Sequence, residues 1–198
     1  MLYYIWNMKP NETGHPNQKI IEHNGQYYPY KVIGPNEILP LVNEYSKELA
    51  SLWDTIPHWV IKCDLARLLY IYYHGGFYMD CDCIVRKKVD LNSSIILFTE
   101  KIVPLSHLSS REIKHPDHSL RVANYAFYAE KQNFILKMAL DECIARLSTL
   151  PKKVTTADIL WVCGPDVITT VYHKYKHSNQ ITLLDQSYLN HIGVGSWR

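Results

Sequence analysis

The stretch PHWVIKCDLARLLYIYYHGG, from Pro57 to Gly76, constrains the fold most, because it is long, periodic and ended by two glycines. Its apolar residues recur at the i, i+3, i+4 and i+7 positions of a helix with one buried face, namely Leu65, Leu68, Leu69 and Tyr72. Pro57 suits a first helical turn, and the glycines allow the left-handed stop. The apolar run 77–79 follows at once. The chain must therefore turn from a helix directly into a short buried strand.

Two aspartates, Asp80 and Asp82, follow that strand. Strand alternation directs them to the same side as Tyr78, away from Phe77 and Met79. Like charges at the end of a buried strand repel each other and are costly to desolvate, so a hard divalent cation is expected between them. A cation held by one or two carboxylates keeps coordination positions that a diphosphate can fill. The pair predicts a metal-diphosphate site.

The rest of the chain alternates strand patterns with helical ones. Strands are predicted at 2–6, 26–33, 77–79, 93–100, 124–131 and 180–185, and helices at 35–54, 57–76, 133–150 and 166–175. The segment 104–117 is predicted to be a long loop, and such loops are often functional. Interleaved strands and helices favour a three-layer α/β domain with its site at the carboxyl ends of the strands.

Length and composition narrow the class of protein. A chain of 198 residues favours one domain, 1–198. A net charge of +2 without a Lys/Arg run argues against a nucleic-acid partner. No apolar run of about 18 residues and no signal peptide is evident, so we expect a soluble, cytoplasmic protein without membrane insertion.

Five cysteines without C-x-x-C spacing indicate free thiols. Strand alternation should turn Cys81 and Cys83 away from the acidic site as small buried side chains.

The run from Asp64 to Asp82, read as D-L-A-R and then L-L-Y-I-Y-Y-H-G-G-F-Y-M-D-C-D, resembles the signature of glycosyltransferase family 32 and its relatives. These relatives include the catalytic core of bacterial glucosylating toxins. Three more segments match in order, with Cys163 in place of the usual Thr: Ile5-Trp6, Cys163-Gly164-Pro165-Asp166, and His191 with Gly195-Ser196-Trp197. The resemblance implies a GT-A fold with a mixed, mostly parallel sheet flanked by helices. The tryptophan so near the last residue suggests a domain cut from a longer polypeptide.

The resemblance also implies residue roles. Asp82 would bind the metal directly, and Asp80 would reach both the metal and the ribose. Asp64 and Arg67 would hold the donor sugar, and Tyr78 would donate to ribose or phosphate. Ile5 and Trp6 would border the nucleotide base. His191, Ser196 and Trp197 would fold over the diphosphate as a lid. For His191, metal ligation, contact with the diphosphate and capping of the final turn stay open.

The activity implied is metal-dependent transfer of a hexose from a nucleotide diphosphate sugar, with a UDP-sugar such as UDP-glucose first and a GDP-sugar second. Mn²⁺ or Mg²⁺ is the implied cofactor, and the acceptor is a glycan, a protein or a lipid. Retention of configuration is implied. An inverting enzyme would need a carboxylate base, for which Asp166, Asp158 and Glu130 are candidates, and a sugar-binding module without transfer activity is the other alternative. A two-metal phosphohydrolase is disfavoured, because the sequence offers no second carboxylate or histidine cluster.

Overall fold

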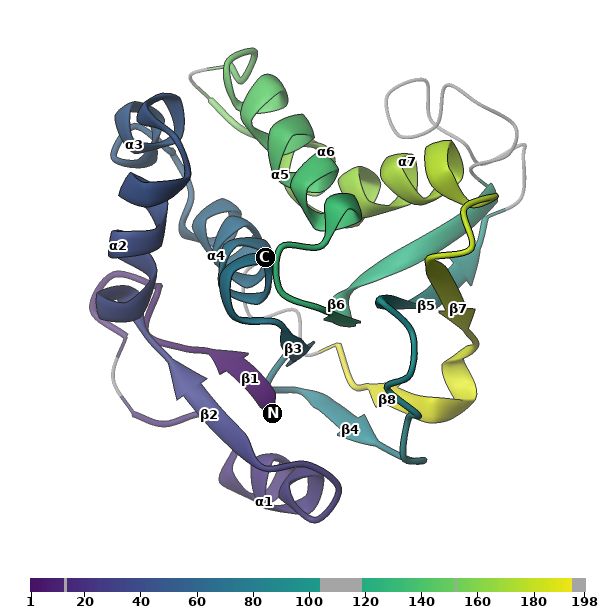
Figure 1. Cartoon of the computed structure of the whole chain (residues 1–198). Coiled ribbons are helices and arrows are strands. Elements are labelled where there is room, and N and C mark those ends of the chain that lie inside the picture. Colours follow the sequence, from purple (N-terminus) through teal and green to yellow (C-terminus); the bar gives the residue numbers. More distant parts are fainter. Residues whose placement is uncertain (13, 104–118, 152, 194–198) are drawn as a thin grey trace.

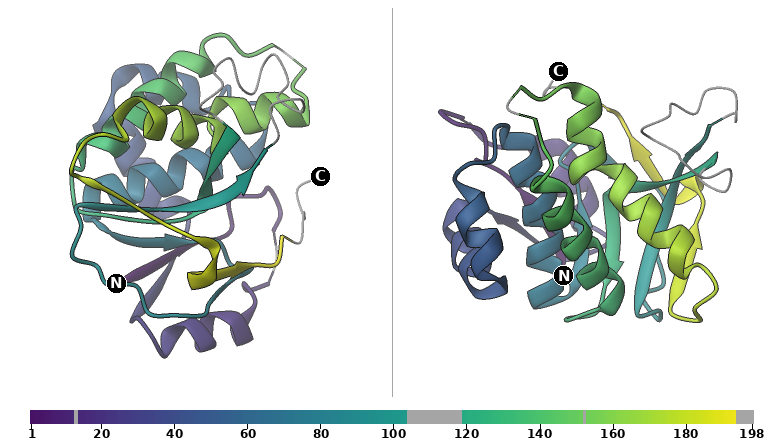
Figure 2. Two further views of the ribbon diagram at one scale, coloured as in Figure 1. Left: turned by 90° about the vertical axis from the view of Figure 1, so that its right-hand side faces the viewer. Right: turned by 90° about the horizontal axis from the view of Figure 1, so that it is seen from above.

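A computed structural model of the chain describes residues 1–12, 14–103, 119–151 and 153–193. The elements form three layers around a central sheet (Figures 1 and 2). The predicted α/β architecture is confirmed.

The central sheet has six strands in the order β2-β1-β3-β6-β5-β7. Five of them point the same way, and β6 runs in the opposite direction between β3 and β5. A separate antiparallel ribbon pairs β4 with β8. The strands are β1 (Leu2–Ile5), β2 (Tyr30–Ile33), β3 (Gly76–Met79), β4 (Cys83–Val85), β5 (Ile95–Ile102), β6 (Leu120–Ala129), β7 (Ile181–Leu184) and β8 (Leu189–His191).

Helices cover the two faces of the sheet unequally. Most of them lie on one face, while α1 and the β4-β8 ribbon lie on the other (Figure 2). The helices are α1 (Gln18–Gly25), α2 (Pro35–Tyr45), α3 (Lys47–Trp53), α4 (Trp59–His74), α5 (Phe134–Leu147), α6 (Thr156–Val162) and α7 (Pro165–Tyr175), with a 3-10 turn, η3, at Gln186–Tyr188.

Each face of the sheet has its own buried apolar cluster. Tyr78 packs in the cluster under α4, whereas Phe77 and Met79 pack in the cluster on the α1 side. The alternation expected along β3 is confirmed, and it turns Tyr78 toward the helical layer.

The central helix α4 begins after His58, whose ring nitrogen Nδ1 accepts a hydrogen bond from the Val60 amide at 3.3 Å. At its other end Gly75 and Gly76 have φ of +66° and +114°. A Cβ on Gly75 would lie 2.8 Å from the Lys131 amide nitrogen, which is too close. Two glycines are therefore needed for the reversal from α4 into β3.

The structure corrects four local predictions. The helix predicted over 35–54 is two helices, because Ser46 is extended and its side chain accepts the Leu49 amide at 3.0 Å, which starts α3. Helices α1 and α6 lie where no helix was predicted, and the β4-β8 ribbon was not anticipated. The ribbon joins segments about a hundred residues apart in the sequence, a pairing that local periodicity does not reveal.

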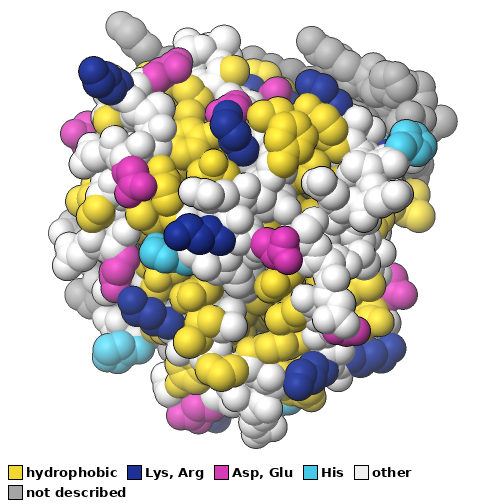
Figure 3. Space-filling model, in the orientation of Figure 1, with side chains coloured by type: hydrophobic (Ala, Val, Ile, Leu, Met, Phe, Trp, Pro, Cys, Tyr) yellow, Lys and Arg dark blue, Asp and Glu magenta, His cyan; other side chains and the backbone are white. Residues whose placement is uncertain are grey.

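Acidic and basic side chains alternate over the face seen in Figure 3, with hydrophobic side chains between them. Within the described ranges, no helix combines the length and the apolar composition that crossing a membrane requires.

Candidate active site

A cavity of about 510 Å³ opens at one edge of the central sheet. The carboxyl ends of β1, β3 and β5 meet there, and β6 begins there because it runs in the opposite direction. Its lining includes Asp64, Arg67, Tyr78, Asp80 and Asp82. The cavity therefore lies at the strand ends, where the sequence predicts the site, and it has the size of a small-molecule site.

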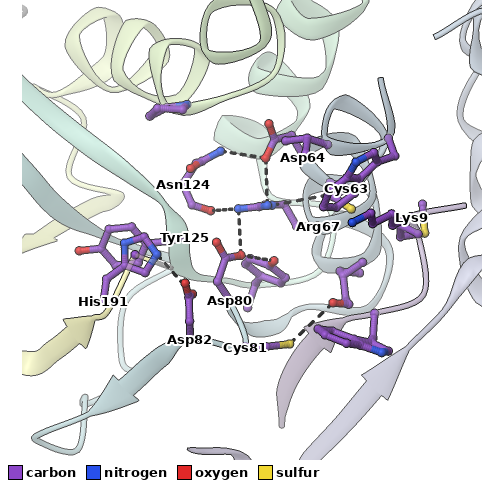
Figure 4. A pocket seen from close by; sticks show the side chains of 18 of the residues that line it. Lys9, Cys63, Asp64, Arg67, Asp80, Cys81, Asp82, Asn124, Tyr125 and His191 are labelled. Atoms are coloured by element: carbon purple, nitrogen blue, oxygen red, sulfur yellow. Dashed lines mark hydrogen bonds and ion pairs between the residues drawn. The ribbon is translucent and has the colours of Figure 1, made fainter. Parts of the chain in front are cut away.

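Arg67 is the centre of a buried network at the base of the cavity (Figure 4). Its guanidinium contacts Asp64 Oδ1 at 2.9 Å and Asp80 Oδ1 at 3.1 Å. Tyr78 donates its hydroxyl hydrogen to the same Asp80 oxygen, and the guanidinium lies over the Tyr78 ring at 4.8 Å. One arginine thus fixes two carboxylates, one from α4 and one from the end of β3.

Asn124 on β6 completes the network. Its backbone carbonyl accepts from Arg67 Nη1 at 2.8 Å, and its side-chain amide donates to Asp64 at 3.1 Å. The pairing of β5 with β6 shifts register between Leu97 and Thr99, which leaves residues 123–126 of β6 without β5 partners in the ladder. Bulges of this kind redirect backbone and side chains beside functional sites.

The network holds more negative than positive charge. Burial raises the pKa of Asp64 to about 7, although Arg67 and Asn124 act to lower it. Burial also raises the pKa of Asp80, against the charge of Arg67 and the hydrogen bond from Tyr78. Because one guanidinium serves two carboxylates, of which Asp64 is buried and Asp80 is partly exposed, the site favours a further positive group beside Asp80.

Asp82 and His191 form the more exposed part of the site. The β4-β8 ribbon pairs Cys83 with His191, and the Ile192 amide donates to the Asp82 carbonyl at 3.0 Å. His191 Nε2 lies 3.3 Å from Asp82 Oδ1. The Tyr125 ring stacks on the imidazole, with centroids 4.1 Å apart.

His191 has a raised pKa. Burial opposes the charged imidazolium, but the hydrogen bond and charge of Asp82, together with the charge of Asp80, outweigh burial. The two aspartates therefore favour the protonated imidazolium of His191.

The donor atoms at this point fit a divalent cation. Asp80, Asp82 and His191 each offer a ligand atom, and these atoms lie within 4.8 Å of one another. Two carboxylate oxygens with one imidazole nitrogen suit a first-row divalent ion. Asp80 already uses Oδ1 for Arg67 and Tyr78, so its other oxygen would be the one available to an ion.

The cavity extends from these acids toward the end of β1. Ile5 and Trp6 line it there, as predicted from the sequence, together with Lys9 and Trp59. Trp6 is held in place by a hydrogen bond from its indole nitrogen to the Gly14 carbonyl, at 3.2 Å. This end offers aromatic and aliphatic surface beside the charged centre.

The prediction that Cys81 turns away from the site is wrong. β3 ends at Met79 and the next residues form a turn, so alternation no longer applies at Cys81, which lines the cavity with its thiol 3.8 Å from the Ile5 carbonyl. Cys83, in contrast, is fully buried, as predicted. Burial raises the pKa of both thiols, so neither is poised as a thiolate.

The remaining predicted residues divide into two groups. Three predictions lie outside the described residues, namely Ser196, Trp197 and the segment 104–117. The other predicted site residues all line the cavity. Among the alternative bases, Asp158 is buried in the cap of α6, and Glu130 lies at the opposite end of β6. Asp166 is buried and forms an ion pair with Arg121 at 3.0 Å.

Among the residues of the cavity wall that sequence reasoning missed are these five: Lys9, Trp59, Glu100, Asn124 and Tyr125. A predicted strand contains Asn124 and Tyr125, but the register shifts that direct them to the cavity have no local sequence signal. Of the five, Trp59 is the one that helical periodicity could best have revealed, because it lies in the first turn of the predicted helix.

Residues 11–104 match the family model described as "Glycosyltransferase sugar-binding region containing DXD motif". That range contains the whole stretch from Asp64 to Asp82. The match covers just under half of the chain, so residues 11–104 are similar to the sugar-binding region of DXD glycosyltransferases. The family resemblance and the assignment to the glycosyltransferases as an enzyme class are confirmed.

One solved structure supports the fold of this chain. The PaToxG glycosyltransferase superposes with a TM-score of 0.58 at 18% identity, covering 87% of this chain and 67% of that one. The UDP-bound glycosyltransferase domain of the YGT toxin gives a TM-score of 0.49 at 10% identity, covering 80% of this chain and 53% of that one. No curated protein matched the sequence. The first similarity confirms the GT-A fold predicted from the sequence.

Proposed function

We propose that this glycosyltransferase moves a hexose from a nucleotide diphosphate sugar to a hydroxyl acceptor, with retention of configuration and with Mn²⁺, or Mg²⁺, as the cofactor. A UDP-sugar, UDP-glucose above all, is the first donor to test, and a GDP-sugar the second. The acceptor class remains a glycan, a protein or a lipid. The bond from the anomeric carbon to the diphosphate oxygen breaks, a bond to the acceptor oxygen forms, and the acceptor proton passes to the departing diphosphate.

One observation carries the proposal: a single cavity joins the Arg67 network to the ligand set of Asp80, Asp82 and His191. A donor that carries both a sugar and a diphosphate needs these two features side by side. Asp64 is fixed by Arg67 and Asn124, which preorganises a carboxylate for sugar hydroxyls. Arg67 adds a positive charge that faces the developing charge of the leaving diphosphate.

A bound divalent cation would stabilise the diphosphate as it leaves. Asp82 and His191 would hold that ion, with the second oxygen of Asp80. Tyr78 keeps Asp80 oriented by donating to its other oxygen. Ile5 and Trp6 would border the nucleoside at the far end of the cavity, and Ser196 and Trp197 would close over the diphosphate.

The direct test is a panel of UDP- and GDP-sugars incubated with the protein, with Mn²⁺ or with EDTA. We expect Mn²⁺-dependent loss of one donor to water, and the first-formed anomer of the released sugar, read by NMR, should retain the donor configuration. Binding of UDP without turnover of any donor would identify a binding module instead. Release of the inverted anomer would contradict the stereochemical part of the proposal.

A further inference from the structure

Glu100 lines the same cavity but takes no part in the Arg67 network or in the candidate metal ligand set. It lies near the end of β5, where the pairing with β6 shifts register between Thr99 and Lys101. Thr99 is opposite Val122 and Lys101 is opposite Arg121, so Glu100 is the extra residue of a bulge. The bulge turns a carboxylate from the sheet edge into the cavity.

Glu100 lies on β5, which β3 and β6 separate from β1, the strand that ends beside Trp6. Its charge acts electrostatically on both Tyr125 and His191. In Figure 4 those two rings lie on one side of Asp80 and Asp82, and Lys9 lies on the other. Glu100 therefore faces the part of the cavity that a nucleotide lying along β1 would leave open.

Arg121 lies behind Glu100, and part of the Glu100 side chain stays exposed at the cavity. Its Oε2 atom is buried 3.6 Å from Arg121 Nε and makes no hydrogen bond among the described residues. The Arg121 guanidinium lies closer to Asp166, at 3.0 Å. About 28% of the Glu100 side chain stays exposed. This is a positioned carboxylate that can accept a hydrogen bond from a ligand.

We propose that Glu100 positions the acceptor: its carboxylate accepts a hydrogen bond from a hydroxyl-bearing, uncharged acceptor group that packs beside Tyr125 and Ile192. An uncharged group is specified because Asp82 and Glu100 would both repel an anion at this end of the cavity. The inference rests on the proposed function and deepens it, since it assigns the acceptor side of the same site. Glu100 acts on the position of the acceptor, and no proton transfer to it is required.

The experiment measures how a Mn²⁺-loaded donor partitions between transfer and hydrolysis. The donor is the one that the nucleotide-sugar panel identifies, and the acceptor probes are methyl α-glucoside, N-acetyltyrosinamide and an alkyl glycerol ether. For the best probe, Glu100→Ala should lower the ratio of transfer to hydrolysis at least tenfold by raising the KM for the probe. Glu100→Asp, which keeps the charge on a shorter side chain, should lower the ratio less.

Glu142→Gln is the matched control. Glu142 also pairs with a buried arginine, Arg146, at 2.7 Å, but it lies on α5 and does not line the cavity. Its ratio of transfer to hydrolysis should equal that of the wild type. A purely structural role for Glu100 would lower transfer and hydrolysis together and leave their ratio unchanged.

An unchanged ratio in Glu100→Ala overturns the inference while leaving the proposed function standing. Hydrolysis by the wild type without transfer to any of the three probes also overturns it. Absence of donor turnover in the wild type contradicts the proposed function itself, so the two failures are distinguishable.

Discussion

The two halves of the acidic site are built differently. Arg67 and Asp64 are almost completely buried and are held by hydrogen bonds and ion pairs. Asp82 and His191 keep 27% and 31% of their side-chain surface exposed and are joined by one longer contact of 3.3 Å. The comparison teaches that the half expected to hold the sugar is formed before any ligand arrives. The half expected to hold the cation stays accessible to it.

The buried half should be the more sensitive to substitution. Arg67→Lys keeps the charge but loses the planar fork that reaches both carboxylates. We expect donor turnover to fall about 100-fold or more, with a loss of about 1–3 kcal/mol in the free energy of unfolding. Steady-state hydrolysis and urea denaturation measure the two effects.

Arg146→Lys provides the control for that result. Arg146 is equally buried, lies over the Trp161 ring at 5.0 Å and pairs with Glu142, but it does not line the cavity. It should lose similar stability without losing turnover. Equal turnover in the Arg67 and Arg146 variants would remove the proposed role of the buried network.

In the accessible half, Asp82→Asn should separate function from stability. We expect turnover to fall about 100-fold, because one carboxylate ligand is lost. The free energy of unfolding should change by less than about 1 kcal/mol, because the Asp82–His191 contact is partly exposed. Calorimetric titration with Mn²⁺ and urea denaturation measure the two effects. A large loss of stability with normal Mn²⁺ binding would show that Asp82 belongs to the structural half of the site and not to the cation-binding half.

His191→Ala should have a smaller effect. We expect Mn²⁺ affinity to fall about 10–100-fold, while the buried network stays intact. The control is His173→Ala, since His173 bonds the Leu120 carbonyl at 2.9 Å and lies outside the cavity lining. If both histidine variants bind Mn²⁺ as the wild type does, His191 is not a ligand.

A further prediction concerns how stability without metal depends on pH. The pKa of Asp64 is about 7 in the folded protein, above its unfolded value of about 3.9. Between these values the folded state binds more protons, so the contribution of Asp64 to stability falls as pH rises from about 4 to 7. The slope is at most about 1.4 kcal/mol per pH unit.

Asp64→Asn should remove that contribution while keeping an oxygen acceptor for Asn124. The raised pKa of His191 adds a loss of stability in the same direction as pH rises, and it remains in the variant. Urea denaturation in EDTA across this pH range measures the difference. Identical slopes for the two proteins would show that Asp64 titrates at its ordinary pKa.

Residues that lie close together in the sequence could be predicted as parts of the site, whereas residues placed by long-range strand pairing could not. In the stretch from Asp64 to Asp82, helical spacing placed Arg67 beside Asp64, and strand alternation placed Asp80 on the side of Tyr78. The family resemblance, not a local pattern, assigned both sets to one site. Alternation gave the wrong side for Cys81, because the strand ends before it. The position of Asn124 and Glu100 depends on register shifts between β5 and β6, which follow from tertiary pairing and have no local pattern.

His191 lies between the residues that the sequence predicted and those that it missed. A family resemblance pointed to it, while no local pattern predicted the β4-β8 ribbon that holds it beside Asp82. Its stacking on Tyr125 likewise joins distant segments. Long-range pairing is the information that a single sequence does not display.

A crystal soaked with MnCl₂ and UDP tests the central claim most directly, through the anomalous signal of manganese. We expect one ion at bonding distance from Asp82, beside Asp80 and His191, with the diphosphate on the same ion and the uracil toward Trp6. An ion bound elsewhere, or a nucleotide lodged outside the cavity, would contradict it.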